Sequence, residues 1–303
     1  MNALVVGGAG FFGSHLTERL LAGGDTVDVV DDLRSGSLGN LADARSMGGE
    51  LKIHTLDAAA DEFHALVALR TPDVIYHLGL LPPGQPAEAN AAAAIGSLMS
   101  VLEAARSLGG VKVVVPLSAV SLYGDVPAKE QPVKESQPWS PVGVRGVISR
   151  SVAELLTVYR ERHAVEFTAL ALANVYGPRQ RPDGGVVGAF ARALHDRVTP
   201  MLQGDGRQTR DFLYIDDAVD ALVRASQRGS GLVVNVGTGV ATSIRDLWSL
   251  MAGPDGRPPA PSPRRPDDVA RFVLSPTRAR IHLAWAPWTD LAVGLRGLGR
   301  GDR

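Results

Sequence analysis

Residues 2–36, NALVVGGAGFFGSHLTERLLAGGDTVDVVDDLRSG, decide the fold of this chain. A short apolar run ends in glycines with the spacing GxxGxxG, at Gly7, Gly10 and Gly13, and a helical pattern follows directly. Glycines suit a backbone that turns tightly and approaches a pyrophosphate, and the helix N-terminus then offers free N–H groups and a positive dipole end. The stretch therefore predicts the phosphate-binding turn of a dinucleotide-binding fold.

An acid closes the second apolar run. Asp31 lies 24 residues beyond Gly7, and Asp32 follows it. A carboxylate at this place accepts hydrogen bonds from the adenosine ribose hydroxyls and repels a 2′-phosphate, which favours NAD over NADP. The alternative is that the two acids only stabilise a turn. Because strand, glycine turn, helix, strand and acid occur in the expected order, we predict an NAD site.

Strand and helix patterns alternate through the first half of the chain. Further elements are expected at 51–56, 74–78, 92–108, 111–117, 147–162 and 167–173. This alternation predicts an α/β, Rossmann-type doubly wound parallel sheet with helices on both faces. The pattern weakens after about residue 177, where Pro and Gly become frequent. We expect an NAD-binding domain at 1–177, to which some later segments return, and a smaller C-terminal substrate-binding lobe at 178–303.

Composition excludes several classes of function. The 303 residues are 45% hydrophobic and 21% charged, with a net charge of −1, so no basic field attracts nucleic acid or anionic lipid. The absence of cysteine excludes disulfides and thiolate chemistry, and the seven histidines lack the spacing of a metal site. No signal peptide and no membrane-spanning run are expected. A cytoplasmic, enzyme-like protein with no metal, nucleic-acid or membrane partner is expected.

The motifs resemble those of the extended short-chain dehydrogenase/reductase family, in its NAD-dependent nucleotide-sugar epimerase/dehydratase branch. Similar segments cover nearly the whole chain: GGAGFFGSHLTERLL, VVDDLRSG, DVIYHLG, SLMSVLEAAR, NVYGPRQRPDGG, GDGRQTRDFLYIDDAVDAL and VNVGTGVATSI. The resemblance implies that Phe11 and Phe12 line the cofactor turn, that Asp57 meets the adenine, and that Leu78 and Gly79 line the cofactor cleft. The family usually has alanine where Gly79 stands.

The resemblance also implies a substrate site for a UDP-, dTDP- or GDP-linked sugar. Asn174 and Arg210 stand where the family holds the nucleotide diphosphate, and RPDDV implicates Arg265 with Asp268. Guanidinium groups grip phosphate oxygens through paired hydrogen bonds. The alternatives are a structural turn cap for Asn174 and a solvated basic loop for Arg265. Family members often dimerise through two helices, here similar to 92–108 and 147–162, so a homodimer is expected.

The family's catalytic groups are missing. The family uses a tyrosine as acid/base and a lysine four residues later, but none of the tyrosines here has a lysine at that spacing, and the last lysine is Lys134. GVISRSVAELL resembles the family's tyrosine-to-lysine helix, which puts Gly146 at the tyrosine position and Arg150 at the lysine position. An alternative placement puts Val142 at the tyrosine position. The family's Ser/Thr position falls on Ala119.

Substitutes for these groups can be named. Ser118 and Ser121 flank Ala119, although either could serve only strand-end hydrogen bonding. Tyr123 belongs to a motif with a structural tyrosine, and Arg150 could hold the nicotinamide ribose or stabilise an oxyanion. His77 is expected to be a core histidine. Three more residues could reach the cleft, although nothing in the sequence singles them out: Arg145, Ser149 and Arg181.

Two functions fit this pattern. The first is an NAD-dependent enzyme that modifies a nucleotide-linked sugar, as an epimerase, dehydratase or ketoreductase with a substitute proton donor. The second is a catalytically inactive pseudoenzyme that binds NAD and a nucleotide sugar and regulates or accompanies another protein. Oxidising an alcohol needs a base, whereas reducing a ketone needs only a proton for a strongly basic alkoxide. Losing the tyrosine should therefore harm an epimerase more than a ketoreductase.

Overall fold

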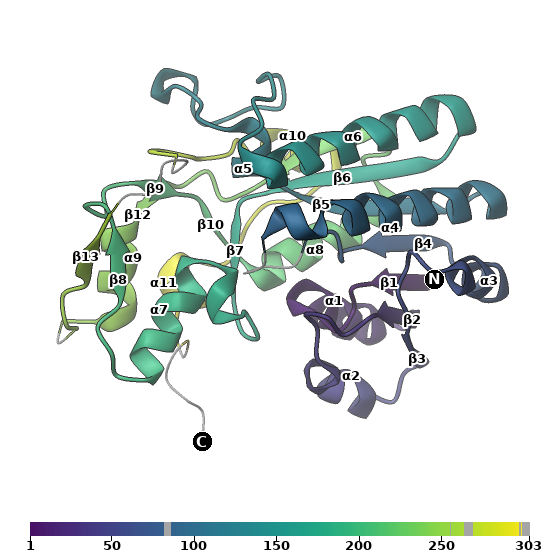
Figure 1. Ribbon diagram of the computed structural model, residues 1–303, viewed down its shortest axis with the longest axis horizontal. Helices are drawn as coiled ribbons and strands as arrows, with labels where there is room; N and C mark the ends of the chain where they lie inside the picture. Colours follow the sequence, from purple (N-terminus) through teal and green to yellow (C-terminus); the bar gives the residue numbers. More distant parts are fainter. Residues whose placement is uncertain (82–85, 255, 264–268, 297, 299–303) are drawn as a thin grey trace.

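The computed structural model describes residues 1–81, 86–254, 256–263, 269–296 and 298. Within these ranges the larger unit is a seven-stranded parallel sheet in the order β11-β6-β5-β4-β1-β2-β3 (Figure 1). The strands are β1 (Asn2–Val6), β2 (Thr26–Asp31), β3 (Leu51–Thr55), β4 (Val74–His77), β5 (Lys112–Ser118), β6 (Glu166–Leu172) and β11 (Leu232–Val236). This sheet confirms the predicted Rossmann-type α/β fold.

Helices cover both faces of the sheet, so the side chains of the central strands β1, β4 and β5 are mostly buried on both faces. In β1, Ala3 and Val5 belong to one core, and Leu4 and Val6 belong to the other. The first core lies under α1 (Phe11–Ala22), α2 (Ala42–Ser46), α8 (Ile215–Gln227) and α10 (Thr277–His282). The second lies under α3 (Asp61–Arg70), α4 (Ala87–Leu108) and α6 (Gly143–His163), with α5 (Ala119–Tyr123) packed on α6.

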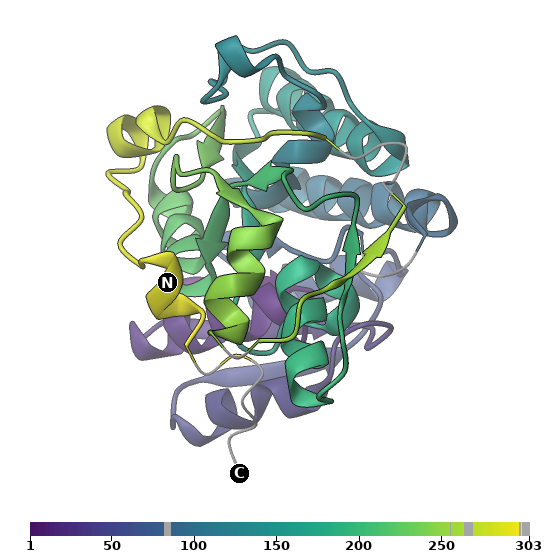
Figure 2. The same ribbon diagram turned by 90° about the vertical axis from the view of Figure 1, so that its left-hand side faces the viewer.

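A smaller lobe lies beyond the end of the sheet where β1 leads into α1, and it faces the viewer in Figure 2. Its elements are α7 (Val186–His195), β8 (Met201–Gln203), β9 (Thr209–Arg210), β12 (Thr242–Ser243), α9 (Ile244–Ala252), β13 (Ala260–Ser262) and α11 (Leu291–Gly294). It has its own core, in which the rings of Phe190 and Trp248 meet edge to face at 5.0 Å. The strands β7 (Asn174–Tyr176) and β10 (Phe212–Tyr214) pair with each other. They lie between this lobe and the elements α8 and β11, which return to the sheet. Three short 3₁₀ helices, η1 (Leu38–Leu41), η2 (Ala128–Glu130) and η3 (Pro182–Gly184), lie in connections.

The helix α4 is long and apolar enough to cross a membrane by length and composition, which the sequence analysis did not anticipate. Here α4 packs against α3, α6 and the sheet, so its apolar side chains contribute to the second core. Of the apolar window in α4, 39% is buried inside the protein. The homodimer predicted through α4 and α6 stays a prediction.

Candidate functional site

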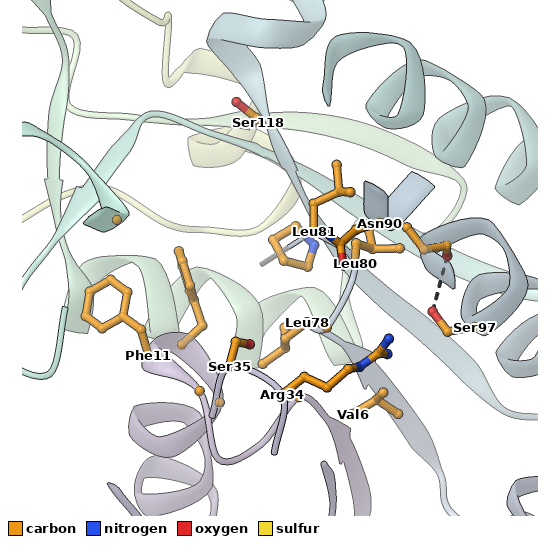
Figure 3. Close-up of a pocket in the computed structure, with 18 of the residues that line it drawn as sticks. Val6, Phe11, Arg34, Ser35, Leu78, Leu80, Leu81, Asn90, Ser97 and Ser118 are labelled. Carbon is orange, nitrogen blue, oxygen red and sulfur yellow. Dashed lines mark hydrogen bonds between the residues drawn. The ribbon is translucent and has the colours of Figure 1, made fainter. Parts of the chain in front are cut away.

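A cleft of about 830 Å³ runs along the carboxyl ends of the central strands. Its lining includes the turn after β1, the ends of β2, β4 and β5, one side of α6, and the segment after β7. Figure 3 shows Phe11, Arg34 and Ser35 at one side of this cleft, with Ser118 set well apart from them. A ligand-binding cleft at the carboxyl ends of parallel strands is typical of open α/β sheets.

The glycine turn is shaped by close backbone approach. Gly7 has φ of +81°, and a Cβ on it would lie 2.8 Å from the nitrogen of Gly79. A Cβ on Gly13 would overlap the carbonyl oxygen of Gly7 and Cα of Gly8. Gly10, the N-cap of α1, has no side chain to cap the first N–H groups of that 12-residue helix. These features fit the diphosphate of a dinucleotide, which needs bare backbone and a helix N-terminus.

Asp31 is fixed at the end of β2. Its Oδ2 accepts a hydrogen bond from the nitrogen of Ala9 at 2.9 Å, and its Oδ1 accepts one from the nitrogen of Leu33 at 2.8 Å. Burial raises the pKa of this carboxyl, while the two backbone donors oppose that rise. Each carboxylate oxygen keeps a further lone pair for a ribose hydroxyl. The carboxylate is therefore oriented by the glycine turn itself.

A second group of charges lies beside Asp31. Arg34 donates to Asp32 at 2.6 Å and lies 3.6 Å from Asp57. The ten predicted cofactor residues all line this one cleft: Gly7, Gly10, Phe11, Phe12, Gly13, Asp31, Asp32, Asp57, Leu78 and Gly79. A Cβ on Gly79 would lie 3.6 Å from Cα of Gly7, so the alanine that the family usually has would fit.

The structure turns a different face of α6 to the cleft from the one that the sequence suggested. Arg145 and Ser149 line the cleft, four residues apart. Gly146 instead packs against α5, where a Cβ would overlap the carbonyl oxygen of Ser121. The side chain of Arg150 is 49% exposed and pairs with Glu154 at 2.8 Å. The structure therefore does not bring Arg150 into the cleft, because each residue turns the helix by about 100°.

The serines and tyrosine after β5 are also separated. Ser118 lines the cleft, and its hydroxyl donates to the hydroxyl of Ser121 at 3.0 Å. Tyr123 is 1% exposed, and its hydroxyl donates to Oδ1 of Asn235 at 2.9 Å. Burial raises the pKa of Tyr123 to about 12. Of these three residues, Ser118 lines the cleft, Ser121 is not among the described lining residues, and Tyr123 is a core residue.

His77 is fully buried at the end of β4. Its Nε2 lies 3.2 Å from the hydroxyl of Ser97, and burial lowers the pKa of His77 to about 4. The imidazole is therefore neutral in the folded protein at neutral pH. This environment is that of a core histidine.

The low pKa of His77 predicts acid sensitivity. The unfolded chain binds this proton near pH 6.5, whereas the folded chain binds it near pH 4. The stability contributed by neutral His77 is complete above pH 6.5 and is lost as pH falls toward 4, by about 3 kcal/mol in the free energy of unfolding. Urea unfolding from pH 7 to pH 4 measures this loss. His77→Asn should flatten the profile, and an unchanged profile would contradict the assignment.

The substrate residues predicted from the resemblance are not all in one place. Asn174 lines the cleft, and its backbone nitrogen donates to the carbonyl oxygen of Asp211 at 3.0 Å. Arg210 is 9% exposed, donates from Nη1 to the carbonyl oxygen of Thr209, and is not among the described residues that line the cleft. Arg265 and Asp268 lie outside the described residues.

Sequence reasoning missed several polar lining residues. These are Ser35, Asn90, Gln180 and Asp183. The signal for two of them was present, because Gln180 and Asp183 follow Asn174 within one motif. Asn90 lies on α4, and no local sequence pattern shows which side of this helix lines the cleft.

Across the described residues, the ionisable groups that line the cleft are Asp31, Asp32, Arg34, Asp57, Arg145, Arg181 and Asp183. Among the described residues of this lining there is no tyrosine, lysine or histidine. Near Ser118 and Ser149 the charged group is the guanidinium of Arg145, and burial lowers its pKa from the usual value. A guanidinium cannot act as a base in a protein. This part of the cleft can bind and stabilise anionic oxygen, but it offers no strong proton acceptor.

Comparisons with known proteins agree with this architecture. A UDP-glucose 4-epimerase of Mycolicibacterium smegmatis is 39% identical, over 97% of this chain and 96% of that protein. The crystal structure of UDP-glucose 4-epimerase with UDP-glucose from Thermotoga maritima matches with a TM-score of 0.91 at 30% identity, covering 99% of this chain and 98% of the other. The UDP-glucuronic acid 4-epimerase from Bacillus cereus, in complex with UDP-glucuronic acid and NAD, matches with a TM-score of 0.89 at 26% identity, covering 99% and 98%.

The family model described as the NAD dependent epimerase/dehydratase family matches residues 3–237, which include the glycine turn, Asp31, α6 and Asn174. The match to this model and the 39% identical relative show that the chain belongs to the NAD dependent epimerase/dehydratase family, whose cofactor is NAD.

Proposed function

We propose that this protein binds NAD or NADH and a UDP-linked sugar in the cleft. It reduces a keto group of the sugar, with a hydride taken from NADH and a proton taken from a hydroxyl or water, and it does not oxidise a sugar alcohol at a useful rate. The observation that carries the proposal is the pair on α6, where Arg145 and Ser149 line the cleft four residues apart. This is the spacing of the family's tyrosine and lysine, so we infer that Arg145 and Ser149 occupy those two positions. The relatives named for UDP-glucose and UDP-glucuronic acid favour UDP as the nucleotide.

The side chains on α6 determine which direction is possible. NAD, when bound, would supply hydride transfer to or from a sugar carbon, and residues of the cleft would handle the proton on the oxygen of that carbon. Arg145 remains cationic at neutral pH, so it stabilises negative charge that develops on this oxygen. In this structure the hydroxyl of Ser118 donates to Ser121 and that of Ser149 donates to the carbonyl oxygen of Arg145. Water, or either hydroxyl after it rotates away from that acceptor, can donate a proton to an alkoxide. Removing a proton from an alcohol needs a base, which the described cleft lining does not supply there.

A second candidate is a protein that binds both ligands without turnover. The same replacement of the tyrosine and lysine favours it, together with Ala119 at the family's Ser/Thr position. Such a protein would regulate or accompany another member of the family. It requires the same binding residues as the reductase and differs only in whether a keto-sugar is consumed.

The test uses purified protein and two reactions. One contains NADH with a UDP-4-keto-sugar, and the other contains NAD with UDP-glucose. We expect loss of NADH absorbance with formation of a UDP-sugar alcohol in the first, and no UDP-galactose in the second. Interconversion of UDP-glucose and UDP-galactose would overturn the proposal. Binding of NADH and UDP by calorimetry without turnover in either reaction would establish the second candidate.

The register of α6 gives a prediction about rebuilding the family's catalytic pair. Arg145→Tyr with Ser149→Lys should restore a proton acceptor and produce UDP-glucose/UDP-galactose interconversion about 100-fold above the unmodified protein, measured by chromatography. The matched control is Gly146→Tyr with Arg150→Lys. It should destabilise the protein without producing activity, because a Cβ on Gly146 would overlap the carbonyl oxygen of Ser121. Activity in the control with none in the first variant would show that the register is wrong.

A further inference from the structure

Arg179 lies outside the cleft lining, yet it connects two walls of the cleft. Its Nη1 donates to Oε1 of Glu18 at 2.6 Å, and its Nη2 donates to Oε2 of Glu18 at 2.8 Å. Nη1 also donates to the carbonyl oxygen of Asn40 at 2.8 Å. Both side chains of the ion pair are only 22% exposed. A paired, partly buried Arg–carboxylate contact is among the stronger polar contacts in proteins.

His15 completes this group, which we call the Arg179 clamp: Arg179, Glu18, His15 and Asn40. Nη2 of Arg179 lies 3.0 Å from Nδ1 of His15, and Nε2 of His15 lies 3.0 Å from the carbonyl oxygen of Pro178. Arginine can only donate and a carbonyl oxygen can only accept. His15 is therefore the neutral tautomer with its proton on Nε2, and it donates to Pro178. Two residues of α1, His15 and Glu18, thus hold the segment that begins at Pro178.

The clamp continues into the glycine turn. The side-chain nitrogen of Asn40 donates to the carbonyl oxygen of Ala9 at 2.9 Å. The backbone nitrogen of Ala9 donates to Oδ2 of Asp31, also at 2.9 Å. Successive hydrogen bonds therefore connect Arg179 to Asn40, Asn40 to Ala9, and Ala9 to the carboxylate of Asp31, which lines the cleft.

The other end of the clamp contacts a segment that lines the cleft. The segment 177–185 follows Asn174, and five of its members line the cleft: Gln180, Arg181, Asp183, Gly184 and Gly185. Arg179 itself has φ of +64°, a left-handed conformation that costs free energy in a residue other than glycine. The contacts of the clamp maintain this conformation, so the position of the segment depends on them.

We propose that the Arg179 clamp couples the two binding sites, so that NAD bound at the glycine turn orders segment 177–185 and strengthens the binding of the UDP moiety. Arg179 is then a positioning residue that touches neither ligand. The inference rests on the proposed function in one respect, namely that NAD and a UDP-linked sugar occupy the cleft. When one ligand has fixed the shared contacts, the second has less ordering to impose, and linkage makes the effect reciprocal.

Hydrogen exchange tests the ordering directly. In the unmodified protein, NAD alone should slow amide exchange in two peptides, one that contains the glycine turn and one that contains residues 177–185. In Arg179→Gly, protection of the glycine turn should remain and protection of 177–185 should disappear. Glycine is the suitable replacement because it adopts φ of +64° without strain, so the variant should fold. The control is Arg192→Ala. It removes an exposed arginine on α7 that forms an ion pair with Asp196, and it should behave like the unmodified protein.

Calorimetric titration measures the coupling itself. The Kd of UDP, measured without and then with saturating NAD, should fall by about 10-fold in the unmodified protein and in Arg192→Ala. The ratio should be about 1 in Arg179→Gly and intermediate in Glu18→Gln, which keeps one acceptor oxygen but loses the charge. A ratio of about 1 in the unmodified protein, or an unchanged ratio in Arg179→Gly, would overturn the inference. Either result with both ligands still binding leaves the proposed function intact, whereas failure of the unmodified protein to bind NAD or UDP would overturn both.

Discussion

Replacing Gly13 with alanine is expected to abolish NAD binding, raising its Kd by at least about 100-fold, and to lower the free energy of unfolding by about 2 to 3 kcal/mol. A Cβ at this position would overlap the carbonyl oxygen of Gly7 and Cα of Gly8. Both are backbone atoms of the turn, so the overlap can be relieved only by opening the turn and displacing the start of α1. Calorimetry with NAD and urea unfolding measure the two effects.

Gly79→Ala is the matched control for this experiment. It adds the same methyl group at a position after β4 that faces the glycine turn, where the Cβ would lie 3.6 Å from Cα of Gly7. We expect its Kd for NAD to stay within about 3-fold and its stability within about 0.5 kcal/mol of the unmodified protein. Unimpaired NAD binding by Gly13→Ala would show that the glycine turn does not hold the cofactor.

Asp211→Ala is expected to lower the free energy of unfolding by about 4 kcal/mol, which is at the upper end for one substitution. Asp211 is fully buried. Its Oδ1 accepts from the nitrogen of Thr238 at 2.9 Å and from its hydroxyl at 2.6 Å, and its Oδ2 accepts from Gly239 at 3.1 Å and Leu274 at 3.3 Å. Removing the carboxylate leaves these donors inside the protein without a partner.

The same substitution should weaken UDP binding, because the backbone of Asp211 shifts once its carboxylate no longer holds it, and its carbonyl oxygen is the acceptor for the backbone nitrogen of cleft-lining Asn174. Urea unfolding and titration with UDP test the two consequences. Asp205→Ala is the control, since its carboxylate is exposed and accepts from the nitrogen of Arg207. It should change stability by no more than about 0.5 kcal/mol. Equal effects in the two variants would contradict a structural role for the buried carboxylate.

Much of the fold follows from local pattern. Alternation of strand and helix, with a glycine turn between the first pair, is sufficient to predict a parallel sheet covered on both faces. The order of the strands is not local, because β11 joins the sheet beside β6 only after the chain has passed through the smaller lobe. The division at residue 177 is therefore approximate in space, since α8 and β11 come later in the chain and pack with the first domain.

The cofactor side of the site was more predictable than the catalytic side for a physical reason. The residues proposed to hold the cofactor lie in the glycine turn and next to β1, β2 and β4, so motif spacing fixes their positions. The residues proposed for the reaction lie on one face of α6, and that face is set by packing against α4 and α5. A shift of one residue along a helix turns the side chains by about 100° and exchanges one pair for another.

The sequence by itself determined that this protein has a dinucleotide-binding turn, an acid suited to NAD, and no tyrosine with a lysine four residues later, since these are facts of residue type and spacing. Only the tertiary structure decided that Arg145 and Ser149 face the cleft while Arg150 faces solvent. Both His77, expected from the sequence to be a core histidine, and Tyr123 are enclosed in the core. The physical reason is that burial and orientation depend on which distant elements pack together, and packing is a property of the whole chain.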